Sequence, residues 1–305
     1  MKYKKPKVIA EIGCNHRGEF EIAKELIQLA KDAGATVAKF QKRHPKTLLS
    51  KEQYHAPHPN PAHAYGKTYG EHREFLEFTI EQHRELKRFC ERLGIGYSTS
   101  VWDTVSTKEV IALEPELIKI PSAMNTHFDI LKLLRDSYTG EIHVSTGMTT
   151  HEEEDALVRF FEETDQATTR LVLYSCTSGY PVDFKDVSLL EITRLKEKFG
   201  DRVKDIGFSG HHNGIAVDIA AYTLGANWIE RHFTKNRTWK GTDHSASLEP
   251  QGLFKLIRNL HATHKSLTFK REELLPVEVV QRKKLKHRPQ TKKNHAKKKT
   301  KKAGK

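Results

Sequence analysis

The chain has 305 residues, of which 37% are hydrophobic, and it carries a formal net charge of +13. This length suits one large domain with an appendage, because α/β barrels commonly form a single unit of about 200 to 250 residues. No stretch approaches eighteen apolar residues, and the basic N-terminus leads into only a short apolar run, so we expect neither a membrane helix nor a signal peptide. Cys14, Cys90 and Cys176 are far apart, with no CxxC spacing. These features predict a soluble cytoplasmic protein with reduced thiols that does not enter a membrane.

The excess positive charge lies at one end of the chain. Residues 282–305 hold thirteen of the 52 Lys and Arg and no Asp or Glu, which leaves 39 basic and 39 acidic side chains in residues 1–281. A segment with so little to bury repels itself and does not fold alone. We therefore predict a catalytic domain over residues 1–281 and a disordered basic tail over residues 282–305. Such a tail can contact polyanions non-specifically, but it has no aromatic residues for base stacking.

Short β-like runs alternate with longer segments of helical spacing eight times along the chain. Eight such units predict an α/β fold of the (β/α)8 TIM-barrel type, because parallel strands need crossover helices and buried strands are almost continuously apolar. An open doubly wound sheet uses the same alternation and is the alternative. The predicted strands cover residues 8–12, 37–41, 96–100, 117–121, 142–146, 171–177, 206–210 and 228–233.

Residues 42–75 form a connection that is too long for a plain barrel loop. The segment contains four prolines and five histidines. Connections of this length in compact domains are usually lids or binding loops, and disorder is the alternative.

Lys39 and Lys119 are expected to enter one rim of the barrel from different strands. Polar groups near the carboxyl end of a barrel strand are costly unless they pair or bind a ligand. Two ammonium groups close to several hydroxyls favour a phosphorylated or multiply anionic small molecule. For a single lysine, an internal ion pair is the alternative.

His211 and His232 come at the ends of the last two predicted strands. Two imidazoles there can hold a divalent metal and leave positions for water and substrate, although a lone histidine at such a place is more often only hydrogen-bonded. With Glu230, Asp243 and His244 close in sequence, Mn²⁺ or Mg²⁺ fits better than a closed zinc site.

At these positions the sequence resembles the sialic acid synthase family, with its legionaminate and pseudaminate relatives, over about residues 7–284. The resemblance implies a metal-dependent condensation of phosphoenolpyruvate with N-acetylmannosamine or a related 2-acetamido aldose, which releases phosphate and forms a nonulosonic acid. The motifs, in chain order, are VIAEIGCNHRG, AKFQ, YSTS, IKIPSA, VSTGM, SCTSGYP, GFSGHH, IERHFT and GTDHSASLEP.

The resemblance also implies roles for single residues. Glu11, Glu230 and His211 would be catalytic, with the two carboxylates supporting the metal shell or proton transfer. Manganese would be the usual metal, with magnesium or cobalt as alternatives, on His211 and His232. Phosphoenolpyruvate would be bound by Lys39, Thr99, Lys119, Ser122, Ser145 and Ser209, and the sugar by Gln41, Tyr180 and Asp243.

Three features depart from the family pattern. Met124 stands where relatives commonly have an acidic residue, and Ser178 stands where an asparagine is frequent. In addition, many relatives continue into an antifreeze-like domain that reaches the partner subunit, whereas here the sequence turns into the basic tail. The sugar acceptor and a homodimer that depends on this domain are therefore open.

Three other functions remain as alternatives to the synthase. The same barrel can use phosphoenolpyruvate with a different aldose or aldose phosphate. The tail can make the protein a polyanion binder. Met124 leaves open a barrel without catalytic activity.

Overall fold

The structure is a computed structural model that describes residues 3–287, and its centre is a closed barrel of eight parallel strands in chain order. Strand β8 pairs with β1, so the sheet has no open edge, and the barrel prediction is confirmed while the open sheet is excluded. The strands are β1 (Lys7–Gly13), β2 (Val37–Lys42), β3 (Gly96–Val101), β4 (Leu117–Ile120), β5 (Glu141–Ser145), β6 (Leu171–Cys176), β7 (Asp205–Gly210) and β8 (Trp228–His232).

The interior of the barrel changes from apolar to polar along the strands. One buried cluster is formed by Ile9, Val37, Leu117, Val172, Tyr174 and Trp228. Because side chains alternate across a strand, the residue two positions further on faces the same interior. Val37 is followed in this way by Lys39, Leu117 by Lys119, and Trp228 by Glu230. The carboxyl half of the barrel is therefore lined with charged and hydroxyl side chains.

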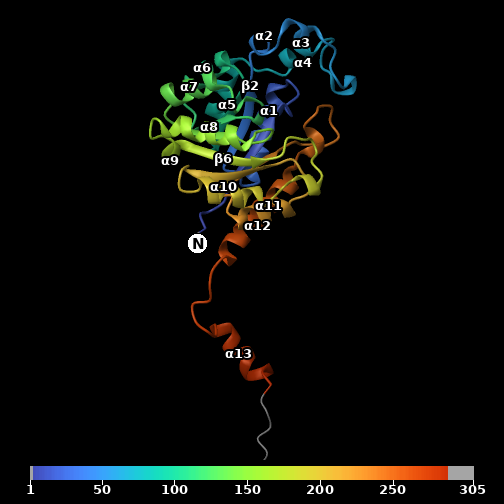
Figure 1. The fold of residues 1–305 in the computed structure, drawn as a ribbon. Coiled ribbons are helices and arrows are strands. Elements are labelled where there is room, and N and C mark those ends of the chain that lie inside the picture. The colour runs from blue at the N-terminus through green and yellow to red at the C-terminus, as the bar shows by residue number, and fades with distance from the viewer. Residues whose placement is uncertain (1–2, 288–305) are drawn as a thin grey trace, which may run out of the picture. The chain divides into compact units, whose positions relative to one another are not determined.

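Helices surround the barrel and are bounded by clear sequence signals (Figure 1). Helix α5 begins after Thr79, whose hydroxyl accepts from the Gln82 amide in a capping box, and it ends at Gly94 with a φ of 67°. A left-handed residue of this kind is the usual helix stop. The main helices are α1 (Phe20–Asp32), α5 (Ile80–Leu93), α6 (Thr104–Ile111), α7 (Phe128–Ser137), α8 (His151–Glu162), α10 (Glu191–Phe199), α11 (Ala216–Leu224) and α12 (Pro250–Ser266). The short helix α9 (Ala167–Arg170) and the 3-10 turns η2 (Ser122–Met124), η3 (Phe184–Asp186) and η4 (His244–Ala246) complete the connections.

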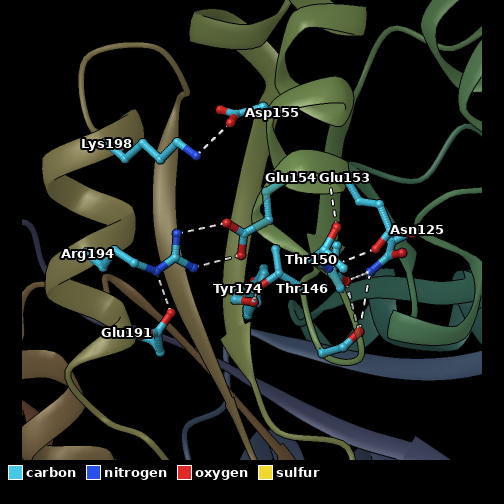
Figure 2. Close-up of polar contacts among 12 residues, drawn as sticks. Asn125, Thr146, Thr150, Glu153, Glu154, Asp155, Tyr174, Glu191, Arg194 and Lys198 are labelled. Carbon is cyan, nitrogen blue, oxygen red and sulfur yellow. Dashed lines mark hydrogen bonds and ion pairs between the residues drawn. The ribbon is translucent and has the colours of Figure 1, made fainter.

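Ion pairs join neighbouring helices of the outer ring. Figure 2 shows Arg194 of α10 donating two hydrogen bonds of 2.8 Å to the Glu154 carboxylate of α8. Lys198 reaches Asp155 at 2.7 Å in the same interface. The paired geometry matters because bidentate guanidinium–carboxylate contacts are stronger than single ones. These contacts lie on the outside of the barrel and hold α8 and α10 together.

The connection over residues 42–75 is folded, so the disorder alternative is wrong. It contains α2 (Pro45–Leu48), α3 (Lys51–His55), η1 (Pro61–His63) and α4 (Tyr69–Phe75), and the three α-helices lie together at one end of the barrel in Figure 1. Ser50 and Thr68 each begin a helix through a capping box. The Tyr65 hydroxyl donates to the Lys240 carbonyl at 2.5 Å. This segment, the β2–α5 insertion, therefore contacts the loop that follows β8.

The chain divides into two compact units, one ending at Ser266 and the other beginning at Leu267. In the second unit, α13 (Pro276–Leu285) starts with proline in its first turn, and Glu278 accepts from the Leu275 amide at 2.9 Å. Residues 282–285, which composition predicts to be disordered, are instead helical because this cap starts the helix upstream. Residues 288–305, most of the predicted tail, lie outside the described residues, so the polyanion prediction stays a prediction. Between residues 3 and 287, no helix is both long and apolar enough to cross a bilayer.

Candidate active site

An open pocket of about 400 Å³ lies at the carboxyl ends of the barrel strands. It contains every predicted site residue except Thr99. The pocket is lined by Glu11, Lys39, Gln41, Arg43, Arg73, Ser100, Trp102, Lys119, Pro121, Ser122, Ala123, Ser145, Met148, Cys176, Ser178, Tyr180, Ser209, His211, Glu230, His232, Thr242 and Asp243. Side chains predicted separately from strand ends thus meet in one cavity, at the end where ligands bind in α/β barrels.

Thr99 does not line the pocket, and its neighbour Ser100 does. The Thr99 side chain is fully buried, and its hydroxyl donates to the Ser100 carbonyl at 3.3 Å. Ser100 instead accepts a hydrogen bond of 2.9 Å from Lys39. Adjacent residues of a strand face opposite sides, so a shift of one position moves a side chain out of the site.

The floor of the pocket is a buried network of two lysines and two carboxylates. Lys39 forms an ion pair with Glu11, and Lys119 donates to both oxygens of Glu230 at 2.9 and 3.0 Å. Lys39 also lies 3.8 Å from Glu230, which links the two pairs. The ion-pair alternative for the lysines is therefore confirmed, and the same lysines line the pocket. Burial lowers the pKa of Lys119, and the charge of Glu230 only partly opposes this effect.

The two carboxylates of this network differ in acidity. Burial raises the pKa of Glu11, and Lys39 only partly opposes the effect. Burial also acts to raise the pKa of Glu230, but the charges of Lys119 and Lys39 outweigh it and lower the pKa to about 2. Glu230 therefore stays ionised near neutral pH. Glu11 is the carboxylate better suited to carry a proton.

His211 and His232 both line the pocket, with ring centroids 5.4 Å apart. The Nδ1 atom of His211 lies 2.9 Å from the Thr177 carbonyl. Burial acts to lower the pKa of His211, but its hydrogen bonds with the Cys176 side chain and the Thr177 carbonyl outweigh this effect and raise the pKa. Nδ1 of His232 is buried without a hydrogen bond, 3.7 Å from an Asp243 oxygen. Burial lowers the pKa of His232 to about 4, so its imidazole is neutral as a metal requires.

The two imidazoles fit the predicted metal only as an incomplete donor set. Within residues 3–287, no group of three or more His, Cys, Asp or Glu side chains is arranged to hold an ion. An ion bound here would therefore take its other ligands from water or substrate, which agrees with an open catalytic site rather than a closed structural one.

Hydroxyl groups converge on Gly147, two residues beyond the end of β5. The Gly147 amide donates to Ser122 Oγ at 3.1 Å. A Cβ added at Gly147 would lie 2.5 Å from Ser178 Oγ and 2.6 Å from Ser122 Oγ, so only glycine admits both hydroxyls. Ser178, one of the departures from the family pattern, thus faces the pocket. Serine hydroxyls can donate to the oxygens of an anion.

Met124 ends η2 and is not among the pocket-lining residues. The next residue, Asn125, which Figure 2 labels, is buried and donates to the Ser145 carbonyl at 2.9 Å. This bond fixes the turn after β4 against β5. Glu11 and Glu230 are the pocket carboxylates next to the lysines.

The pocket residues that were not predicted from the sequence include two arginines and a tryptophan: Arg43, Arg73 and Trp102. Arg43 lies 2.7 Å from a Glu77 oxygen and 4.6 Å from the centre of the Trp102 ring, and it also contacts the Gln41 amide. Its position two residues after Gln41 continues the alternation of β2, a signal that could have identified it. Arg73 belongs to α4 of the β2–α5 insertion, and no local pattern predicts its place in the pocket.

A closed parallel barrel with a pocket of lysine, histidine and carboxylate side chains at its carboxyl rim is the architecture of an α/β-barrel enzyme. The sequence profile of the NeuB family matches residues 26–272, and the chain belongs to this family of sialic acid synthases. It is 36% identical over 278 residues to the human N-acetylneuraminate-9-phosphate synthase, covering 91% of this chain and 76% of the relative. It is 33% identical over 264 residues to the Campylobacter jejuni N,N'-diacetyllegionaminic acid synthase, covering 87% and 78%.

A solved structure agrees with these relatives. The N-acetylneuraminic acid synthetase of Leptospira borgpetersenii, crystallised with citrate, superposes with a TM-score of 0.76 at 26% identity and covers 93% of this chain and 94% of that one. The barrel described above is therefore the architecture of a synthase of this family.

Proposed function

We propose that the protein condenses phosphoenolpyruvate with N-acetylmannosamine or a related 2-acetamido aldose, forming a nonulosonic acid and phosphate. The observation that carries the proposal is the convergence of Lys39 and Lys119 with the rim hydroxyls in the cavity that also holds His211 and His232. The relatives are named as synthases of such acids. Ser100 takes the phosphoenolpyruvate-binding role predicted for Thr99.

The lysines and hydroxyls account for binding of the phosphorylated substrate. Lys39 and Lys119 form buried ion pairs with Glu11 and Glu230, which position their ammonium groups in the pocket. A phosphate or carboxylate that enters the pocket then gains charge-assisted hydrogen bonds from preorganised ammonium groups. Ser122 and Ser178, next to the Gly147 amide, supply further donors.

The two carboxylates account for proton transfer and charge stabilisation. The C3 atom of phosphoenolpyruvate forms a bond to the aldehyde carbon, whose oxygen needs a proton, and water then adds at C2 before the C–O bond to phosphate breaks. Glu11, whose pKa is raised by burial, is suited to exchange that proton. Glu230 remains ionised and stabilises positive charge that develops at C2.

His211 and His232 would hold the divalent metal, for which Mn²⁺ is preferred and Mg²⁺ or Co²⁺ are alternatives. When bound, the metal would polarise the aldehyde. His211 is also aligned by Tyr180, whose ring centroid lies 4.3 Å away. Gln41 donates to Glu11 at 2.7 Å and, with Asp243, is placed to contact the sugar.

Arg73 favours a second candidate, in which the acceptor is an aldose phosphate. It lines the pocket and forms no ion pair with a carboxylate of residues 3–287; it donates to the Tyr69 hydroxyl at 3.0 Å from Nε. A guanidinium without an acidic partner in a substrate pocket suits a phosphate group on the acceptor. The human relative is named for a phosphorylated product.

The test is phosphate release from phosphoenolpyruvate with Mn²⁺ and a panel of aldoses. The panel contains N-acetylmannosamine, its 6-phosphate, other 2-acetamido aldoses and simple aldoses. Release that requires both the metal and a 2-acetamido acceptor supports the proposal. A strong preference for the phosphorylated acceptor selects the second candidate. No release with any acceptor would refute the synthase function and favour the barrel without catalytic activity.

A further inference from the structure

A buried chain of side chains leads from the pocket lysine Lys119 toward the opposite end of the barrel. The Lys119 ammonium lies 4.2 Å from the centre of the Tyr174 ring. The Tyr174 hydroxyl lies 2.7 Å from His143 Nδ1, and His143 Nε2 lies 3.0 Å from a Glu141 oxygen. Neither Tyr174 nor His143 is a pocket residue, and the proposed reaction does not use them.

The hydrogen bonds in this chain have a definite direction. Burial tends to raise the pKa of Glu141, but His143 and Lys204 lower it to about 2, and burial lowers the pKa of His143. Near neutral pH the carboxylate is thus ionised and the imidazole neutral. His143 must then donate from Nε2 to Glu141 and accept at Nδ1 from the Tyr174 hydroxyl. Donation by the phenol increases electron density on the ring.

Gly207 leaves space for the ring of Tyr174 next to Lys119. On the neighbouring strand, a Cβ added at Gly207 would lie 2.6 Å from Tyr174 Cε1. Any other residue at 207 would therefore displace the ring. Tyr174 and His143 are completely buried, and the Trp228 ring packs edge-on against His143 at 4.7 Å. This packing fixes the ring face toward the ammonium.

We propose that Tyr174, polarised through His143 and Glu141, is a positioning residue that holds the Lys119 ammonium in place for the phosphorylated substrate. The ammonium has Glu230 on one side and the ring face of Tyr174 on another. Cation–π attraction between these buried groups adds to the ion pair and restricts the lysine side chain. The proposal rests on the synthase function for its kinetic consequences.

The kinetic test compares Tyr174→Leu with the wild-type enzyme. Loss of the ring face is expected to raise the KM for phosphoenolpyruvate roughly 2- to 30-fold, with a much smaller change in kcat and in the KM for the sugar. The double variant Tyr174→Phe/His143→Leu keeps the ring and removes both hydrogen-bonding partners together, so its increase is expected to be smaller. If Tyr174→Leu does not fold, this double variant decides the matter, because a KM for phosphoenolpyruvate at the wild-type level would overturn the polarisation of the ring through His143 and Glu141.

Tyr97→Phe is the matched control. Tyr97 is buried, and its hydroxyl lies 2.7 Å from His83 Nδ1, so this variant breaks a second buried Tyr–His hydrogen bond away from the pocket. Its KM values should stay at the wild-type level. An unchanged KM in folded Tyr174→Leu, or an equal rise in Tyr97→Phe, would overturn the proposal.

A spectroscopic test is independent of catalysis. In ligand-free protein labelled at lysine, the ε-methylene protons of Lys119 should be shifted upfield by the Tyr174 ring current, and the Lys119→Arg variant identifies the signal. The shift should disappear in Tyr174→Leu and persist in Tyr97→Phe. If the wild-type protein releases no phosphate but shows this shift, the synthase function fails while the lysine–ring contact stands. If the wild-type protein does not show the shift, the Tyr174 ring does not face the Lys119 ammonium and the proposal is wrong.

Discussion

The two halves of the pocket are built in different ways. The half that holds Lys39, Lys119, Ser209 and Glu230 comes from barrel strands, whose register fixes neighbouring side chains. The other half, with Arg73 and Asp243, comes from the β2–α5 insertion and the loop after β8. Strand residues are held by many backbone hydrogen bonds, whereas loop residues depend on a few tertiary contacts. We infer that the strand half binds phosphoenolpyruvate and that the loop half selects the acceptor.

The largest effect is expected from removing a lysine of the strand half. Lys39→Met leaves Glu11 without its partner and takes away one phosphate contact, so kcat/KM should fall roughly 10²- to 10⁴-fold. Lys42→Met is the control, because Lys42 is also buried on β2 but pairs with Glu109 at 3.2 Å. Steady-state phosphate release measures both. A comparable fall in kcat/KM in the two variants would mean that Lys39 stabilises the fold and does not bind the substrate.

The charge network of the strand half should also contribute to stability in a pH-dependent way. The folded-state pKa of Glu230 is about 2, below its ordinary value of 4.5, so its contribution is present above pH 4.5 and is lost as the pH falls through 2. Glu230→Gln should therefore reduce the free energy of unfolding at pH 7 by on the order of 3 kcal/mol.

Urea unfolding at pH 7, 4 and 2.5 measures the difference in free energy of unfolding between the wild-type protein and Glu230→Gln. This difference should become smaller only below pH 4.5. Glu21→Gln is the control, because Glu21 is exposed and pairs with Lys24 on the surface of α1. Its effect should stay within about 0.5 kcal/mol. A deficit in Glu230→Gln that does not change with pH would contradict the assignment of charge to this carboxylate.

Removing an imidazole where the two halves meet should have an intermediate effect. His232→Ala is expected to weaken Mn²⁺ binding and phosphate release roughly 10- to 100-fold. Mn²⁺ affinity can be followed by electron paramagnetic resonance without substrate. His244→Gln is the control, since His244 is buried in η4 beside the Thr234 hydroxyl at 2.7 Å and does not line the pocket. Unchanged Mn²⁺ affinity in His232→Ala would disprove the metal assignment.

The smallest effect is expected in the loop half, where it should be confined to the acceptor. Arg73→Ala should raise the KM for a phosphorylated acceptor roughly 5- to 30-fold and leave the KM for phosphoenolpyruvate unchanged. Arg84→Ala, at an exposed site on α5, is the control. A rise in the KM for phosphoenolpyruvate would show that the two halves do not divide the substrates as inferred.

The sequence by itself determined the barrel and most of the strand half of the site. Eight apolar runs with crossover helices leave few topologies, and the twofold alternation of a strand assigns Glu11, Lys39, Lys119 and Glu230 to the interior. The one misplaced strand residue, Thr99, shows the limit of this reasoning, because an error of one position reverses the face.

The resemblance had already named the loop residues Tyr180 and Asp243, but only the tertiary structure decided that Arg73 enters the pocket. Arg73 is brought there because the β2–α5 insertion folds over the rim and contacts the loop after β8 through Tyr65 and Lys240. The ion pairs of the lysines and the contact between Lys119 and Tyr174 were likewise settled by packing. Local sequence periodicity carries the direction of a side chain within an element, but distances between elements depend on how the whole barrel closes.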